Sequence, residues 1–223
     1  MKQLSRTTAA VAVAVACAAG ALRAQGAPAP ARGTLAELEA LYRARADSAR
    51  MRFSRADVEF VTGMIAHHAQ ALIMAALAEG RGASPAVRVL CGRIINAQRD
   101  EIETMQTWLR ERRQPLPEVH IEGLDLMLHG VDGSHARMPG MLTRAELEEL
   151  ERSYGREFDR LFLTYMIRHH QGAVTMVLDL FATDGGAQDE VVFKLASDIQ
   201  VDQLTEIERM QLMLASLGPN PQR

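Results

Sequence analysis

Apolar residues recur at intervals of three and four along most of this chain, which is the spacing of one buried face on an α-helix. Four long segments carry the pattern: residues 55–79, 85–112, 156–182 and 189–217. No segment shows the sustained alternation that is typical of a half-buried β-strand. The pattern therefore predicts an all-α protein.

Polar residues mark where the helices begin. A serine or threonine with an acid three residues later forms a capping box, which satisfies free N–H groups at a helix start. Three pairs have this spacing: Thr34 with Glu37, Ser54 with Asp57, and Thr143 with Glu146. They predict a short helix before the first long segment and another that ends near Ser153. The stretch 114–142 lacks clear periodicity, so residues 113–155 are predicted to form a long connection.

The chain also contains an internal repeat. The sequence MIAHHAQALIMA, which starts at Met64, returns 102 residues later as MIRHHQGAVTMV, which starts at Met166. Two helical hairpins joined by a long crossover are typical of a four-helix bundle, and two copies are too few for a solenoid. We expect a single bundle within 34–223, with repeat one at 55–112 and repeat two at 156–217, preceded by the short N-terminal helix.

Helical geometry places the repeated polar residues beside the predicted core. At about 100° per residue, His67 and His68 lie on or beside the apolar stripe that contains Met64. Glu101 shares an arc with core residues of the following helix, and Glu206 holds the matching place 105 residues later. A buried carboxylate is costly unless it is paired or bound to a metal ion. The twinned histidines and acids therefore predict a polar centre inside the bundle.

The ligand types favour copper over iron. Di-iron carboxylate bundles carry Glu-x-x-His motifs, and this sequence has none. A methionine instead precedes the first histidine of each pair by three residues. Thioether and imidazole together favour copper, particularly Cu(I), with other transition metals as alternatives. The candidate metal ligands are Met64, His67, His68, Glu101, Met105, Met166, His169, His170, Glu206 and Met210.

The same residues also fit a structural interpretation. A His–Glu ion pair can fix the register of two helices without a metal ion, and methionines at helical spacing are typical of core packing. Met74 and Met176 are interpreted as packing residues for this reason. Adjacent histidines point about 100° apart, so the sequence leaves open which of each pair reaches the centre. Cys91 lies on a buried arc, but its counterpart is Ala196, and we interpret it as a small core residue.

The connection contains a second candidate metal site. Its members are His129, His135, Met138 and Met141. In the sequence MPGM two thioethers flank a Pro-Gly turn, and methionines in a loop are less readily explained by core packing. The alternative is that Met138 and Met141 close one end of the bundle.

Five stretches spread along residues 55–217 together resemble a known family: MIAHHAQALIMA, QRDEIETM, MPGML, FDRLFLTYMIRHHQGAVTM and DQLTEIERM. They resemble the domain-of-unknown-function family 305, whose members are exported bacterial proteins with a ferritin-like four-helix bundle. Some members are copper-binding proteins linked to copper tolerance, which implies Met64, His67, His68 and their repeats as the first candidates here. Two departures exist. Ala66 stands where many relatives have proline, and the crossover is less rich in histidine, which weakens the case for the second site.

The N-terminal residues predict export. A basic start precedes a run rich in alanine and valine, as in a secretory signal peptide at 1–24. Cleavage is expected after Ala24, with Ala21 as the rival position. Lipid attachment at Cys17 is the alternative, and only then is a membrane tether expected. Residues 25–33 are typical of a flexible tether.

Charge and motifs narrow the function. Removing 1–24 takes away three basic and no acidic residues, so the net charge falls from −3 to −6, which argues against a nucleic-acid partner. The sequence shows no catalytic nucleophile or phosphate-cradling loop, so an enzyme is not expected. We expect a periplasmic or secreted protein that binds copper for sequestration or handover, alone or as a homo-oligomer. The alternatives are a ferritin-like redox enzyme and a metal-free helical interaction module.

Overall fold

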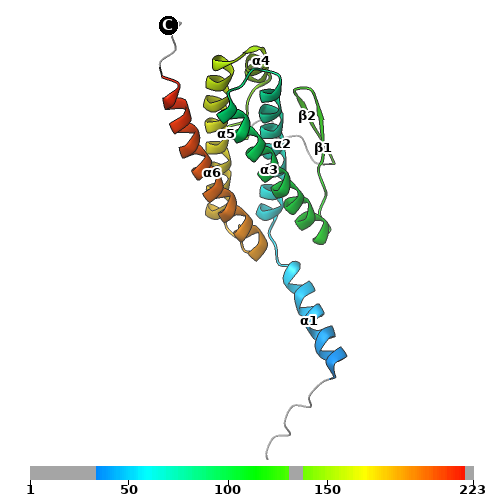
Figure 1. Cartoon of the computed structure of the whole chain (residues 1–223). Helices are drawn as coiled ribbons and strands as arrows, with labels where there is room; N and C mark the ends of the chain where they lie inside the picture. The colour runs from blue at the N-terminus through cyan, green and yellow to red at the C-terminus, as the bar shows by residue number, and fades with distance from the viewer. Residues whose placement is uncertain (1–33, 131–137, 219–223) are drawn as a thin grey trace, which may run out of the picture. The chain divides into compact units, whose positions relative to one another are not determined.

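The structure, a computed structural model, describes residues 34–130 and 138–218. The chain is mostly helical, which confirms the predicted class for the bulk of it. Its helices are α1 (Leu35–Arg50), α2 (Arg55–Ala76) with the 3-10 helix η1 (Leu77–Glu79), α3 (Pro85–Glu111), α4 (Arg144–Arg152), α5 (Arg156–Ala182) and α6 (Glu190–Ser216) (Figure 1). The chain divides into two units after residue 41. Helix α1 begins in the first unit, and the other elements belong to the second.

Capping boxes begin the helices where the sequence predicts them. Ser54 Oγ accepts a hydrogen bond from the backbone N–H of Asp57 at 3.0 Å, and the Ser54 N–H donates to the Asp57 carboxylate at 2.8 Å. Thr143 and Glu146 make the same reciprocal pair at the start of α4. Four N–H groups at a helix start have no partner within the helix, so these contacts fix the starting residues.

The acids at the start of α2 and α5 also hold loops of the other half of the chain. Asp57 Oδ1 accepts a hydrogen bond at 2.7 Å from the backbone N–H of Ala187, in the loop before α6. Asp159, its counterpart in the repeat, accepts one at 3.1 Å from the N–H of Ser84, just before α3. Both carboxylates are buried. Each of the two loops is therefore anchored to the first turn of a helix in the opposite repeat.

The core lies between four helices, α2, α3, α5 and α6, which we call the helical body. Helix α2 packs against α3, α5 packs against α6, and α2 contacts α5. A first core cluster joins the start of α2 to the end of α5, and it includes Phe60, Met64, Met105, Trp108, Val177 and Ile199. A second core cluster joins the end of α2 to the start of α5, and it includes Met74, Leu90, Ile94, Phe162, Met166 and Met210. Helices α2 and α5 therefore run antiparallel, and the repeated histidines lie between the clusters.

The connection contains two strands, so the prediction that the chain has no strand was wrong here. Strand β1 (Glu118–Glu122) pairs antiparallel with β2 (Asp125–His129), with Glu122 opposite Asp125. The two-residue turn uses Gly123 at a φ of +59°, a conformation that glycine adopts readily. Each strand has only five residues, and the turn lacks the Asn-Gly or Asp-Gly pair that signals a hairpin. The hairpin lies beside α2 (Figure 1).

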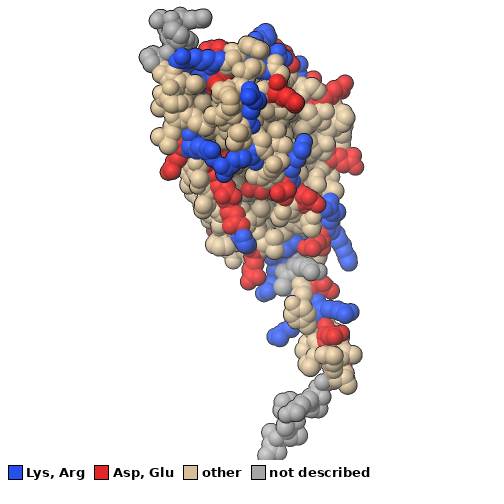
Figure 2. All heavy atoms as spheres, in the orientation of Figure 1, with Lys and Arg blue, Asp and Glu red and all other residues tan. Residues whose placement is uncertain are grey.

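Helix α2 is apolar enough to be mistaken for a membrane span. An 18-residue window within residues 55–79 reaches a mean hydropathy of 1.4, but 78% of that window is buried inside the protein. Its apolar surface is thus used in the core. On the face shown in Figure 2, acidic and basic side chains are interspersed. The predicted signal peptide at 1–24, the tether at 25–33 and Cys17 lie outside the described residues.

Candidate metal centre

The first histidines of the two repeats meet at the middle of the helical body. His67 on α2 and His169 on α5 have ring centroids 3.9 Å apart, and both side chains are fully buried. The Nε2 atom of His67 lies 3.0 Å from the Pro139 carbonyl oxygen. Because a carbonyl only accepts, Nε2 carries the proton and Nδ1 keeps its lone pair. Neither His67 Nδ1 nor any ring nitrogen of His169 has a hydrogen-bond partner.

Both central rings are neutral at neutral pH. Burial, assisted by the neighbouring His68, lowers the pKa of His67 to about 3. Burial and the facing His67 hold the pKa of His169 well below its usual value. Neutral imidazole is the form that binds metal ions, so each ring already has one nitrogen with a lone pair available for binding.

The second histidines turn outward to the repeated glutamates. His170 Nε2 lies 2.7 Å from Glu206 Oε2 in a hydrogen bond between α5 and α6. His68 Nε2 lies 2.6 Å from Glu101 Oε2, an ion-pair contact without hydrogen-bond alignment. The carboxylates are at the edge of the core, with 16% and 19% of their side chains exposed, rather than fully buried as the helical arcs suggested. Each pair orients its ring, which leaves the two Nδ1 atoms without partners.

The four methionines of the candidate set are fully buried, but they divide between the two core clusters. Met64 and Met105 lie in the first cluster, whereas Met166 and Met210 lie in the second. The histidine layer thus has thioether side chains on both sides. The structure does not bring all ten predicted ligands to one point. Among the described residues, no three His, Cys, Asp or Glu side chains form a group that could hold a metal ion.

Two glutamines add further unpartnered polar atoms. Gln98 on α3 and Gln203 on α6 occupy matching positions, three residues before Glu101 and Glu206, and are 1% and 2% exposed. Neither side-chain polar atom of Gln98 has a partner, and Gln203 Oε1 has none. A buried polar group without a partner costs about 1–3 kcal/mol. This concentration of unpaired nitrogen and oxygen atoms fits a bound group that would satisfy them.

The MPGM turn closes directly over the histidine pair. Gly140 has a φ of +79°, and a Cβ there would lie 2.6 Å from the Arg168 carbonyl oxygen. A Cβ on Gly172 would lie 2.0 Å from the Pro139 carbonyl oxygen. Both glycines are therefore needed for the turn to contact α5, and this contact puts the Pro139 carbonyl within reach of His67.

The two methionines of this turn have different surroundings. Met138 Sδ lies 3.3 Å from the place where a Gly63 Cβ would be, and Met176 Cε lies 3.4 Å from the same place. Two thioether side chains therefore converge over Gly63, one helical turn before His67. Met141 instead lines a separate cavity of about 430 Å³ beside Gln70.

The second predicted site does not assemble among the described residues. His129 is exposed at the end of β2, and His135 lies outside the described residues. Met138 lies near Met176 over Gly63, and Met141 lines a different cavity. Sequence reasoning assigned Met176 to packing, and it does pack against the first core cluster. Its place in the repeated motif was also a signal that it sits near the histidines. Burial raises the pKa of the Cys91 thiol to about 12, with Asp159 adding to the effect, which suits a packing role.

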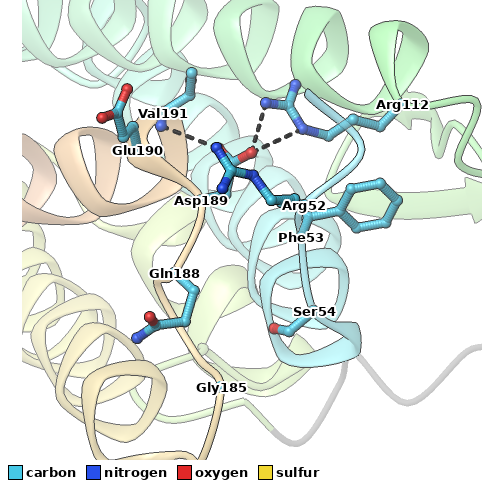
Figure 3. Close-up of a pocket in the computed structure, with 9 residues that line it drawn as sticks. All are labelled: Arg52, Phe53, Ser54, Arg112, Gly185, Gln188, Asp189, Glu190 and Val191. Atoms are coloured by element: carbon cyan, nitrogen blue, oxygen red, sulfur yellow. Dashed lines mark hydrogen bonds and ion pairs between the residues drawn. The ribbon is translucent and has the colours of Figure 1, made fainter. Parts of the chain in front are cut away.

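A cavity of about 670 Å³ lies near the start of α6 and has none of the candidate ligands in its lining (Figure 3). Arg112 Nη2 is 2.7 Å from Asp189 Oδ2, and Trp108 Nε1 donates to Asp189 Oδ1 at 3.0 Å. Burial opposes ionisation of this carboxyl, but those two partners hold the pKa of Asp189 below its usual value. Arg52 projects into the same space (Figure 3). Asp189 caps the start of α6, and its ion pair with Arg112 anchors this helix to the end of α3.

Comparison with known proteins decides the family. The model of a family described as a domain of unknown function (DUF305) matches residues 57–214. The chain belongs to the DUF305 family. A DUF305 fragment from Deinococcus radiodurans is 35% identical, with a TM-score of 0.61 over 74% of this chain and 98% of that one. A DUF305 protein from Streptomyces coelicolor, whose description predicts that it is secreted, is 27% identical. Its TM-score is 0.62, and the match covers 75% of this chain and 96% of that one. No curated protein matches.

Solved structures of CopM are also similar to this DUF305 chain. The Cu(I)-bound form is 27% identical, with a TM-score of 0.54 over 73% of this chain and 98% of that one. CopM has also been solved with Cu(II) and with silver. Copper and silver binding thus occurs in a protein with this fold.

Proposed function

We propose that this DUF305 protein is an exported copper-binding protein whose cargo is Cu(I), bound at the His67–His169 pair. The observation that carries the proposal is the pairing of two buried, neutral imidazoles from matched positions, in which His67 Nδ1 and both ring nitrogens of His169 have no hydrogen-bond partner. A ring nitrogen with a free lone pair in a closed apolar body is a ready ligand for a soft cation.

The surrounding residues have complementary roles in this proposal. Met64 and Met166 supply thioether sulfur on either side of the histidine layer. Met138 and Met176 supply thioether sulfur beside Gly63, one helical turn before His67. Cu(I) favours soft sulfur and imidazole ligands, whereas a hard oxygen-rich site would require several carboxylates placed to hold one ion, and the described residues form no such group. The His68–Glu101 and His170–Glu206 pairs orient their rings and keep them in place.

The comparisons support copper over the two rivals. CopM is similar over most of both chains and has been solved with Cu(I). A ferritin-like redox enzyme would use Glu-x-x-His motifs, which this chain lacks. A metal-free interaction module would leave the buried nitrogens without partners, at a cost in stability.

We further propose the finer features of fold and location. The helical body is a ferritin-like four-helix bundle of two repeated hairpins, supported by the packing of α2 on α3 and α5 on α6. Residues 1–24 act as a signal peptide, supported by the resemblance to the Streptomyces protein. Sequestration or handover of copper outside the cytoplasm is the role that such a site suits.

Anaerobic titration with Cu(I) against a competing chelator tests the proposal. The protein is expressed with its own N-terminal sequence and compared with the double variant His67→Ala/His169→Ala. The matched control is His120→Ala/His129→Ala, because these two histidines are exposed on the β-hairpin. Circular dichroism confirms that each variant is folded. Loss of tight binding in the first variant alone supports the proposal. Equal binding in all three proteins, or none in any, overturns it.

A further inference from the structure

Helix α6 carries an exposed apolar row on the side that faces away from the core. Its members are Phe193, Val201, Leu204 and Leu212, which are 55%, 62%, 46% and 74% exposed. At 3.6 residues per turn they fall within an arc of about 100°, so they form one face over roughly 28 Å of helix. Phe181 at the end of α5 extends the row, since its ring centroid lies 5.7 Å from that of Phe193.

The sequence repeat provides an internal comparison for this face. The residues 105 positions earlier, on α3, are Arg88, Asn96, Arg99 and Thr107, and all are exposed. These four positions are thus polar in the first repeat and apolar in the second, although Val89 on α3 is also exposed. Packing of the helical body does not require apolar residues there, so the row on α6 has a separate cause. Exposed apolar side chains that gather on one helix face in this way point to an interaction site.

The intervals between the four residues of the row are the same when they are read from either end of α6. They are eight, three and eight residues. A second α6 laid antiparallel across the first places Phe193 opposite Leu212 and Val201 opposite Leu204 at the same time. A two-fold interface requires one surface that complements itself, and this row has that property.

The charges beside the row also complement one another in this arrangement. Lys194 and Glu208 lie on the same face of α6 as the row and are exposed. In the antiparallel pairing, Glu208 of one copy lies opposite position 197 of the other, one turn from Lys194. Two identical Lys–Glu contacts result. Lys194 pairs with Asp198 of its own helix, and Glu208 makes no ion pair among the described residues.

We propose that α6 is the contact surface of a symmetric homodimer, in which two copies pair antiparallel through this row. The occupant of the exposed face is a second copy of this chain. The dimer needs no metal ion, so it is independent of the copper proposal.

Sedimentation velocity over a range of micromolar concentrations tests the dimer. The wild-type protein is expected to sediment at twice the mass of one chain. Val201→Glu/Leu204→Glu is expected to raise the dissociation constant by about 100-fold or more, because it buries two like charges in each copy. The matched control, Asn96→Glu/Arg99→Glu on α3, is expected to dimerise as the wild type does. A monomeric wild type, or equal dimerisation of both variants, overturns the proposal.

A charge exchange between Lys194 and Glu208 distinguishes loss of the dimer from misfolding of a variant. Lys194→Glu and Glu208→Lys are each expected to weaken the dimer, and the two substitutions together are expected to restore it. Failure of the double variant to recover overturns the antiparallel pairing. The measurements are repeated with a Cu(I) chelator. A dimer that disappears there is bridged by metal, which also overturns the inference.

Discussion

His67 and His169 lie with 3.9 Å between their ring centroids and their ring planes tilted by 39°, although 102 residues separate them in the chain. Two imidazoles at this distance cannot both be protonated without strong repulsion in a buried site. Burial of both rings lowers their pKa values further, so both are neutral in the folded protein. Protonation of these histidines therefore opposes folding.

The metal-free protein is expected to lose stability as the pH falls below about 6.5. The pKa of His67 is about 3 in the folded state and near 6.5 when unfolded, so below 6.5 the unfolded chain binds more protons. Stability is therefore complete above that value and declines toward pH 3. Each such histidine is expected to cost about 1.4 kcal/mol at about pH 5.5. Urea unfolding with a chelator present measures this.

The pH prediction has an internal control. His120→Ala/His129→Ala removes two exposed histidines and is expected to leave the slope of stability against pH unchanged. His67→Gln/His169→Gln is expected to flatten it. Stability that stays constant between about pH 7.5 and 5.5 in the wild type would contradict the assignment of neutral rings.

Replacing Met138 and Met176 together with leucine is expected to weaken Cu(I) binding by about tenfold, equivalent to about 1.4 kcal/mol. Leucine keeps most of the volume and removes the sulfur, so stability is expected to change by less than about 1.5 kcal/mol. Met141→Leu is the control, because Met141 lies in a different cavity. Competition with a chelator measures affinity. An equal loss in the control would assign the effect to the turn as a whole.

Gly172→Ala is expected to destabilise the protein by about 1–3 kcal/mol, because the new Cβ would lie 2.0 Å from the Pro139 carbonyl oxygen. Gly92→Ala provides the matched control on α3, where a Cβ meets nothing within 4 Å. That change is expected to raise stability by up to about 1 kcal/mol, since alanine favours helix. Thermal and urea unfolding measure both. Similar effects of the two substitutions would argue against close contact between the turn and α5.

Asp189→Ala is expected to destabilise the protein by about 3–5 kcal/mol, because it leaves the buried Arg112 charge with only the longer 3.7 Å ion-pair contact to Glu111. The exposed pair of Lys194 with Asp198 gives the comparison, and Lys194→Ala is expected to cost less than about 1 kcal/mol. Affinity for Cu(I) is expected to stay within a factor of about two in both variants, since neither residue is near the histidines. A large loss of affinity in Asp189→Ala would show that the two regions are coupled.

The sequence was most informative about features that depend only on neighbouring residues, such as helix starts and the buried face of a helix. Ser54 with Asp57 and Thr143 with Glu146 identified helix starts because a capping box involves only four neighbouring residues. Helical arcs placed His67 in the core for a similar reason. They could not show that Glu101 reaches the edge of the core, because an arc describes the direction of a Cβ and not the length of a side chain.

Contacts between distant segments could not be predicted in this way. The pairing of Met138 with Met176 depends on the MPGM turn lying on α5, which in turn depends on Gly140 and Gly172. Nothing in the spacing of these residues reports their distance in space. The β-hairpin was missed because a five-residue strand has too little alternation to distinguish it from a loop.

The reciprocal contacts of Asp57 with Ala187 and of Asp159 with Ser84 make neither half self-sufficient. A polypeptide that ended after the first hairpin would contain Asp57 without the loop around Ala187 that it binds. It would also contain the loop at Ser84 without Asp159 to accept its hydrogen bond. Such a half could satisfy both only by assembling with another half of the same kind. The fused chain supplies that second half permanently, so the central histidine pair forms at every dilution, by folding alone.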